Sequence, residues 1–121
     1  YTLHTLFPYT TLFRSENQKF ILKLFELFSN LLKILEREGK GEVDFAINEV
    51  KYIVKILNDC ILNNFCEDNK TIKEVKEIHS SLYPPKGGLS EFFVWRNDFN
   101  ERIKINNYLD NIKKELWKVL T

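Results

Sequence analysis

The stretch NQKFILKLFELFSNLLKILEREGKGEVDFAINEVKYIVKILNDCILNNF, residues 17–65, decides the fold. Its apolar residues recur every three or four positions on both sides of Gly39 and Gly41. The two series are Phe20, Leu24, Leu27, Leu31 and Leu35, then Ala46, Val50, Ile53, Leu57 and Ile61. This is the period of an amphipathic α-helix with one buried face, and glycine readily ends a helix. The stretch therefore predicts an antiparallel helical hairpin, with helices over residues 17–38 and 42–65.

The rest of the chain carries signals for two further helices. Apolar spacing predicts a third helix over residues 70–82, which a Pro/Gly turn (PPKGG, residues 84–88) ends because a proline pushes the preceding residue out of helical geometry. A last helix is expected over residues 107–120, with Asn106 as its N-cap. Residues 89–107 form either a short helix or an irregular segment. The predicted fold is all-α: a small helical bundle of a hairpin, two further helices and a Pro/Gly turn.

Residues 5–15, TLFPYTTLFRS, do not belong to this pattern. They resemble, residue by residue, one reading frame of the adapter oligonucleotide that is ligated to DNA fragments for sequencing. We interpret residues 1–15 as a non-native segment and expect a single helical domain over residues 16–121. Because the chain contains no Met, we expect part of the natural N-terminus to be missing. A signal peptide is the alternative, but residues 8–11 (PYTT) interrupt the apolar run that it requires.

Charge and cysteine content restrict the class of protein. Of the 18 Lys and Arg residues, Arg14 lies in the adapter-like segment, so 17 basic residues remain against 17 acidic ones. This balance argues against a nucleic-acid partner, and the lack of a long uncharged apolar run argues against a membrane partner. On one helix, Cys60 and Cys66 would lie about 9 Å apart along the axis and on different faces, too far for a disulfide, and we expect both to be reduced. Reduced cysteines and the Lys-, Ile- and Asn-rich composition together suggest a bacterial cytoplasmic protein.

Catalytic side chains are scarce. His79 is the only histidine of residues 16–121, and it lies beside the apolar stripe of its helix, so we interpret it as a structural side chain. No second histidine or neighbouring cysteine completes a metal-binding set. The alternative is an enzyme in which His79 acts with Glu77 or a carboxylate of residues 91–101. We expect no catalytic residue, no metal, no cofactor and no enzymatic activity.

Residues 84–102 concentrate the side chains that protein interfaces favour. Aromatic residues and arginine are enriched at binding hot spots. The candidate partner-binding residues are Phe93, Trp95, Arg96, Asp98 and Arg102. The carboxylates of Glu91, Asp98 and Glu101 are available to pair with the two arginines. The alternative is that Phe92, Phe93 and Trp95 fill the open end of the hairpin as part of the core.

A resemblance extends from this segment to the end of the chain. It is carried by LY at residues 82–83, GGLSEF at 87–92 and NNYLDNIKKELW at 106–117. These motifs resemble the C-terminal half of small, uncharacterised bacterial helical domains that look like accessory or immunity proteins encoded near toxins. The PPK stretch at residues 84–86 departs from that pattern as an insertion. The resemblance implies a helical fold and supplies no catalytic residue.

These observations favour a small cytosolic binding protein. We expect an immunity or accessory role in which the chain occludes a bacterial toxin or another protein partner. The alternative is a structural or oligomerising helical module, because the apolar stripe of residues 17–65 is wide and a second copy of the chain is a candidate to cover it. The expected partner is therefore a protein or the chain itself.

Overall fold

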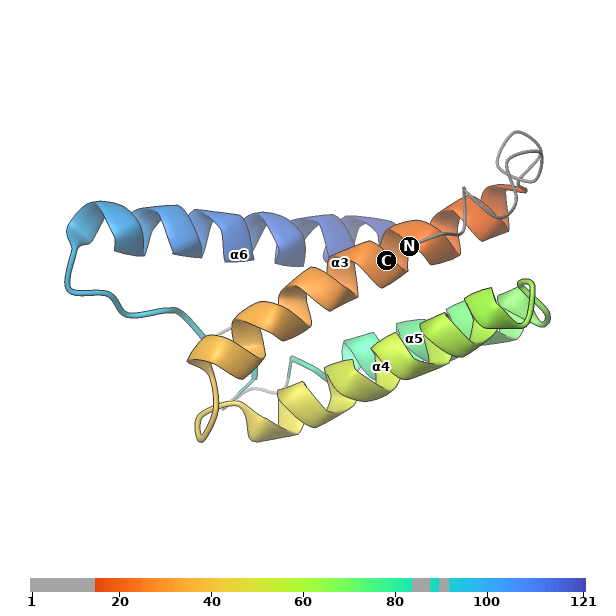
Figure 1. The fold of residues 1–121 in the computed structure, drawn as a ribbon, viewed down its shortest axis with the longest axis horizontal. Helices are drawn as coiled ribbons and strands as arrows, with labels where there is room; N and C mark the ends of the chain where they lie inside the picture. Colours follow the sequence, from red (N-terminus) through yellow and green to blue (C-terminus); the bar gives the residue numbers. More distant parts are fainter. Residues whose placement is uncertain (1–14, 84–87, 90–91) are drawn as a thin grey trace.

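The computed structural model describes residues 15–83, 88–89 and 92–121. Within them the chain forms four helices and no strand: α3 (Glu16–Glu38), α4 (Asp44–Leu62), α5 (Asp68–Ser80) and α6 (Phe99–Leu120) (Figure 1). The predicted all-α bundle with its N-terminal hairpin is confirmed. The predictions for residues 1–14, for most of the Pro/Gly turn (84–87) and for residues 90–91 lie outside the described residues.

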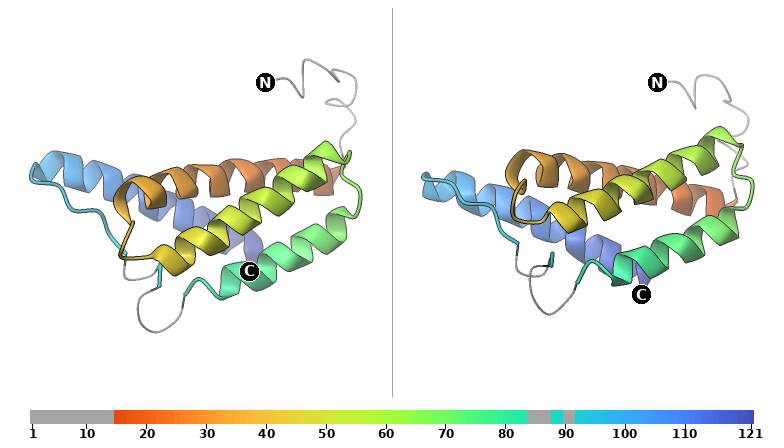
Figure 2. Two further views of the ribbon diagram at one scale, coloured as in Figure 1. Left: turned by 60° about the horizontal axis from the view of Figure 1, so that its bottom comes forward. Right: turned by 90° about the horizontal axis from the view of Figure 1, so that it is seen from below.

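Helix α3 is the central element of the bundle. It contacts α4, α5 and α6, while α4 also contacts α5. Helices α4 and α6 both run in the opposite direction to α3 (Figures 1 and 2). The first turns of α6 extend past the C-terminal end of α3 in every view, so they project from the bundle. None of the helices in the described part of the chain has both the length and the apolar character that a membrane span requires.

The core is built on α3 and reaches only part of α6. The buried side chains of α3 are Ile21, Leu24, Phe28, Leu31, Ile34 and Leu35. Helix α4 buries a matching set, Ala46, Ile47, Val50, Ile53, Leu57, Cys60 and Ile61. In α6 the buried residues begin at Leu109 and continue with Ile112, Leu116 and Leu120. Since a buried Leu or Ile side chain contributes roughly 1.5–3 kcal/mol, the second half of α6 holds this helix on the bundle.

Helix α3 begins with a capping box. The backbone N–H of Gln18 donates to Ser15 Oγ, and the backbone N–H of Ser15 donates to Gln18 Oε1, both at 3.2 Å. This reciprocal pair satisfies backbone donors that would otherwise lack a partner at the helix start. Ser15, the last residue of the adapter-like string, is therefore the N-cap of the central helix.

Helix α4 is shorter at both ends than the predicted span of 42–65. At its start, Gly41 has a φ of 85° and its N–H donates to Asp44 Oδ1 at 2.7 Å, which completes the turn out of α3. At its end, Asn64 and Phe65 have positive φ angles of 60° and 62°, a conformation that no α-helix contains. Helix α5 likewise begins and ends two residues before the predicted 70–82.

The start of the last helix was predicted wrongly. Helix α6 begins at Phe99 rather than at residue 107, because Asp98 caps it: the backbone N–H of Glu101 donates to Asp98 Oδ2 at 2.8 Å. Aspartate is a strong N-cap, and its negative charge also favours a helix N-terminus. Asn106, the expected cap, lies inside the helix.

Replacing Phe28 tests the central position of α3. This side chain is fully buried, so Phe28→Ala leaves a cavity and should lower the free energy of unfolding by about 3–5 kcal/mol in urea titrations. Phe45 on α4 is 56% exposed and supplies the matched control. Phe45→Ala should change the free energy by less than about 0.5 kcal/mol. Equal losses from both variants would contradict this description of the core.

Candidate functional site

The segment before α6 is extended and its side chains alternate between core and solvent. Phe92 and Val94 are buried, whereas Phe93 is 53% exposed and Trp95 is 62% exposed. This alternation is that of an extended chain with one face on the core. The two sequence interpretations therefore each apply to part of the cluster: Phe92 belongs to the core, and Phe93 and Trp95 face solvent.

Asn106 fastens this extended segment to α6. Its side-chain amide accepts a hydrogen bond from Val94 N and donates one to Val94 O, each at 2.7 Å. The same amide nitrogen also donates to Arg102 O at 2.8 Å. The Asn106 side chain thus supplies the hydrogen-bond donor and acceptor that a neighbouring strand would otherwise offer to the backbone of Val94. We call residues 92–108, which combine the extended segment and the first turns of α6, the arm.

Arg96 joins the arm to the end of α3. Its Nη1 and Nη2 atoms donate to Glu38 Oε1 and Oε2, both at 2.6 Å, in a bidentate ion pair. The Glu38 side chain is 12% exposed. Hydrogen bonds from Arg96, with a further one from Arg37, lower the Glu38 pKa to about 2. Among the described carboxylates, the ion-pair partner of Arg96 is therefore Glu38 on α3, and not Asp98 or Glu101 of its own segment.

Arg102 lies over two exposed aromatic rings. Its guanidinium carbon is 4.3 Å from the ring centroid of Trp95 and 5.4 Å from that of Phe99. Nη1 donates to Arg96 O at 3.2 Å. No ion pair joins Arg102 to a carboxylate among residues 15–83, 88–89 and 92–121. A cation held in this way is attracted to the rings and keeps several N–H donors for another acceptor.

The five candidate residues thus have different environments. The structure brings Trp95, Arg102 and Phe99 together, with Phe93 and Ile103 also exposed on the arm. Two of the candidates are engaged within the chain, Arg96 in the ion pair and Asp98 in the N-cap. We call Phe93, Trp95, Phe99, Arg102 and Ile103 the arm surface.

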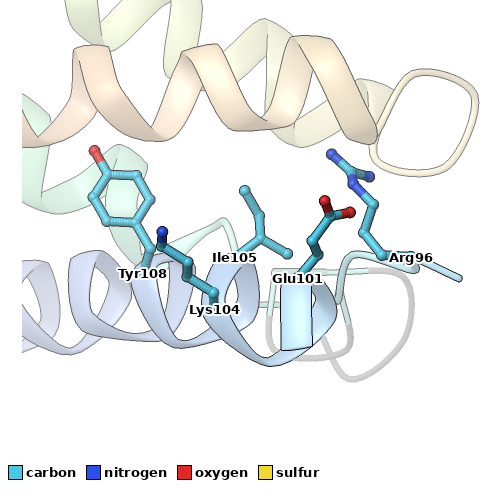
Figure 3. Close-up of a pocket in the computed structure, with 5 residues that line it drawn as sticks. All are labelled: Arg96, Glu101, Lys104, Ile105 and Tyr108. Atoms are coloured by element: carbon cyan, nitrogen blue, oxygen red, sulfur yellow. The ribbon is translucent and has the colours of Figure 1, made fainter. Parts of the chain in front are cut away.

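The arm carries a cleft that was not predicted from the sequence. It has a volume of about 350 Å³ and is lined by Arg96, Glu101, Lys104, Ile105 and Tyr108. Figure 3 shows these side chains extending from the arm toward α3. Four of them recur at helical spacing on one face of α6. Recognising Asp98 as the N-cap would have started the helix early enough to find that face.

His79 occupies a closed aromatic environment. It is 2% exposed, and its ring centroid lies 5.3 Å from that of Tyr83, 5.7 Å from Trp117 and 6.2 Å from Phe28. Burial lowers the His79 pKa to about 4, so the ring is neutral at pH 7. Its Nε2 atom has no hydrogen-bond partner among the described residues. This environment supports the structural interpretation of His79, and the described chain contains no group of His, Cys, Asp and Glu that would hold a metal ion.

No family model, curated protein sequence or solved structure matches the chain. The resemblance carried by residues 82–117 therefore remains a prediction from the sequence.

The buried His79 should make the fold sensitive to mild acid. Its pKa falls from 6.5 to about 4 on folding, so the unfolded chain binds more protons between these values and stability decreases as the pH is lowered through this range. From about pH 7 to about pH 5 we expect a loss of about 2 kcal/mol in urea titrations. The variant His79→Leu should lose much less over the same range. An identical pH dependence in both proteins would contradict the neutral buried state of His79.

The ion pair to Arg96 should be visible in the titration of Glu38. In Arg96→Met the Glu38 pKa should rise from about 2 toward the ordinary glutamate value, because its strongest hydrogen-bond donor is lost. Carboxyl carbon chemical shifts followed by NMR against pH measure this change. Lys23→Met is the control, since Lys23 pairs with Glu115 and not with Glu38. A Glu38 pKa unchanged in Arg96→Met would show that the arm is not joined to α3 through this pair.

Proposed function

We propose that this chain is a small protein-binding module whose arm surface docks on a protein partner and occludes it. The observation that carries the proposal is the stack of Arg102 on Trp95 and Phe99, which are 62% and 61% exposed on a helix end that projects from the bundle. An immunity or accessory role in the bacterial cytoplasm, with a toxin as the partner, is the specific form that the sequence resemblance suggests. Such a role requires stoichiometric binding and no catalysis.

The composition of the arm surface supports binding. Its side chains combine three aromatic residues, Arg102 and Ile103, and aromatic residues and arginine dominate interface hot spots. Soluble proteins rarely expose a contiguous group of large apolar side chains unless that group takes part in binding. The arm surface therefore differs from scattered single apolar residues such as Phe45 on α4.

The arm surface is also held in place before any partner binds. The pair of Arg96 with Glu38, the Asn106 bonds to Val94 and the Asp98 cap fix the backbone that carries it. Side chains that are already ordered lose less conformational entropy on binding, which leaves more of the contact energy as affinity. In this proposal Arg96 and Asp98 act by positioning the surface.

Arg102 indicates the chemistry of the partner. One of its N–H groups donates to Arg96 O, and within the described residues its charge has no carboxylate partner. A partner that places a carboxylate over Arg102 and apolar side chains beside Trp95 and Phe99 would satisfy both features. We therefore propose a partner with an acidic residue surrounded by an apolar rim.

The two tryptophans of the chain provide a matched test. Trp95 is 62% exposed on the arm, and Trp117 is 51% exposed near the other end of α6. Trp95→Ala should weaken the interaction by about 30-fold or more, the effect of losing one hot-spot side chain, whereas Trp117→Ala should bind as the parent chain does. Capture of host proteins on the tagged parent and both variants, with quantitative mass spectrometry, measures the difference.

The same comparison separates the alternatives. A protein that is retained equally by the parent chain and by Trp95→Ala would contradict docking on the arm surface, provided that circular dichroism shows both chains to be folded. If the parent recovers only itself and sediments as a dimer that Trp95→Ala converts to a monomer, the oligomerising module replaces the occluding role.

A further inference from the structure

The two cysteines lie on either side of the turn between α4 and α5. Cys60 is in the last turns of α4 and is 4% exposed, whereas Cys66 is exposed. Helix α4 ends at Leu62, so the two cysteines do not share a helix and the spacing that one helix would give them does not apply. Their separation is therefore set by the path of the turn and not by the rise of a helix.

The turn brings Cys66 back toward Cys60. The backbone N–H of Phe65 donates to Cys60 O at 2.8 Å, and the Cys60 thiol donates to Cys66 O across 3.7 Å. Asn64, Phe65 and Glu67 all have left-handed φ angles, between 56° and 62°. Residues with a Cβ rarely adopt this conformation, so three of them within four positions mark a tightly folded turn.

This geometry is compatible with a disulfide. A residue's Cβ lies about 3 Å from its own carbonyl oxygen, so Cys66 Cβ lies within about 7 Å of Cys60 Sγ. A bridge requires the two sulfur atoms to approach to about 2 Å, a movement that rotation of the exposed Cys66 side chain and adjustment of the turn residues must supply. We propose that Cys60 and Cys66 form a redox modification site, which a small-molecule disulfide converts into an intramolecular disulfide.

The reaction proceeds by two exchanges. The exposed Cys66 thiolate attacks a disulfide RSSR, forms a mixed disulfide with one R–S group and releases the other as RSH after protonation. The Cys60 thiol then loses its proton to solvent, attacks Cys66 Sγ and releases the second RSH. Two protein thiols are oxidised and one RSSR is reduced to two RSH. Burial raises the pKa of the Cys60 thiol, which slows the second step, while its proximity to Cys66 favours it.

Oxidised glutathione is a suitable probe, and intact-mass spectrometry of the folded full chain is the readout. The parent chain should lose two hydrogen atoms without keeping a glutathione adduct, and dithiothreitol should reverse the change. Cys60→Ser should keep one stable adduct on Cys66. Cys66→Ser should remain unmodified, because its remaining thiol is buried.

Two results would overturn the proposal. One is a parent chain that accumulates the mixed disulfide at Cys66 with Cys60 still reduced. The other is a parent chain that forms covalent dimers through Cys66. Peptide mapping of the oxidised parent chain identifies the bridge without any variant, so the test remains decisive if Cys60→Ser does not fold.

Discussion

Burial of the apolar side of α3 is the interaction on which the rest of the structure depends. Helices α4, α5 and α6 all contact α3, and its six buried side chains form the centre of the core. Because the hydrophobic effect scales with the apolar area removed from water, each of the other helices is stable only where it covers α3 or a neighbour already packed on it. Helix α6 meets this condition from Leu109 onward, and its earlier turns project without a buried residue. The first turns of α6 therefore project from the bundle because this helix is longer than the part of it that packs on the core.

Polar contacts act together with the buried side chains of Phe92 and Val94 to determine how the arm is oriented. Glu38 at the end of α3 holds Arg96, Asn106 holds the backbone of Val94, and Asp98 caps α6. The bonds of Arg96 and Asn106 are partly buried and the Asp98 cap is exposed, and together they fix the direction of the arm. This places the side chains of Trp95 and Phe99 at the surface, with the guanidinium of Arg102 over their rings. The side chains of the arm surface are thus carried on a fixed backbone while they remain accessible to solvent, and this combination suits them to binding.

The two proposed sites lie at opposite ends of the bundle. The arm projects beyond the C-terminal end of α3, while the turn between α4 and α5 lies at the other end, beside the start of α3 (Figure 1). Between them, His79 packs against Phe28 of α3 and Trp117 of α6, which places an uncharged imidazole where three helices meet. A disulfide at the turn would therefore leave the contacts of the arm unchanged, and the two proposals stand or fall separately.

The sequence by itself determined the helical class, the hairpin and the presence of an aromatic cluster before α6, whereas the structure decided which of those rings are exposed. Those features follow from local causes: the three- and four-residue apolar period, the glycines after α3 and the density of aromatic residues before α6. The cap of α6 was also local, since Asp98 precedes Glu101 by three residues, and assigning that role to Asn106 was an error of interpretation. Tertiary structure alone decided that Arg96 pairs with Glu38, 58 residues away, and that Arg102 stacks on Trp95. It also decided that Cys66 returns to Cys60. Such contacts depend on where packing places each backbone, and no residue pattern within one segment specifies the position of another.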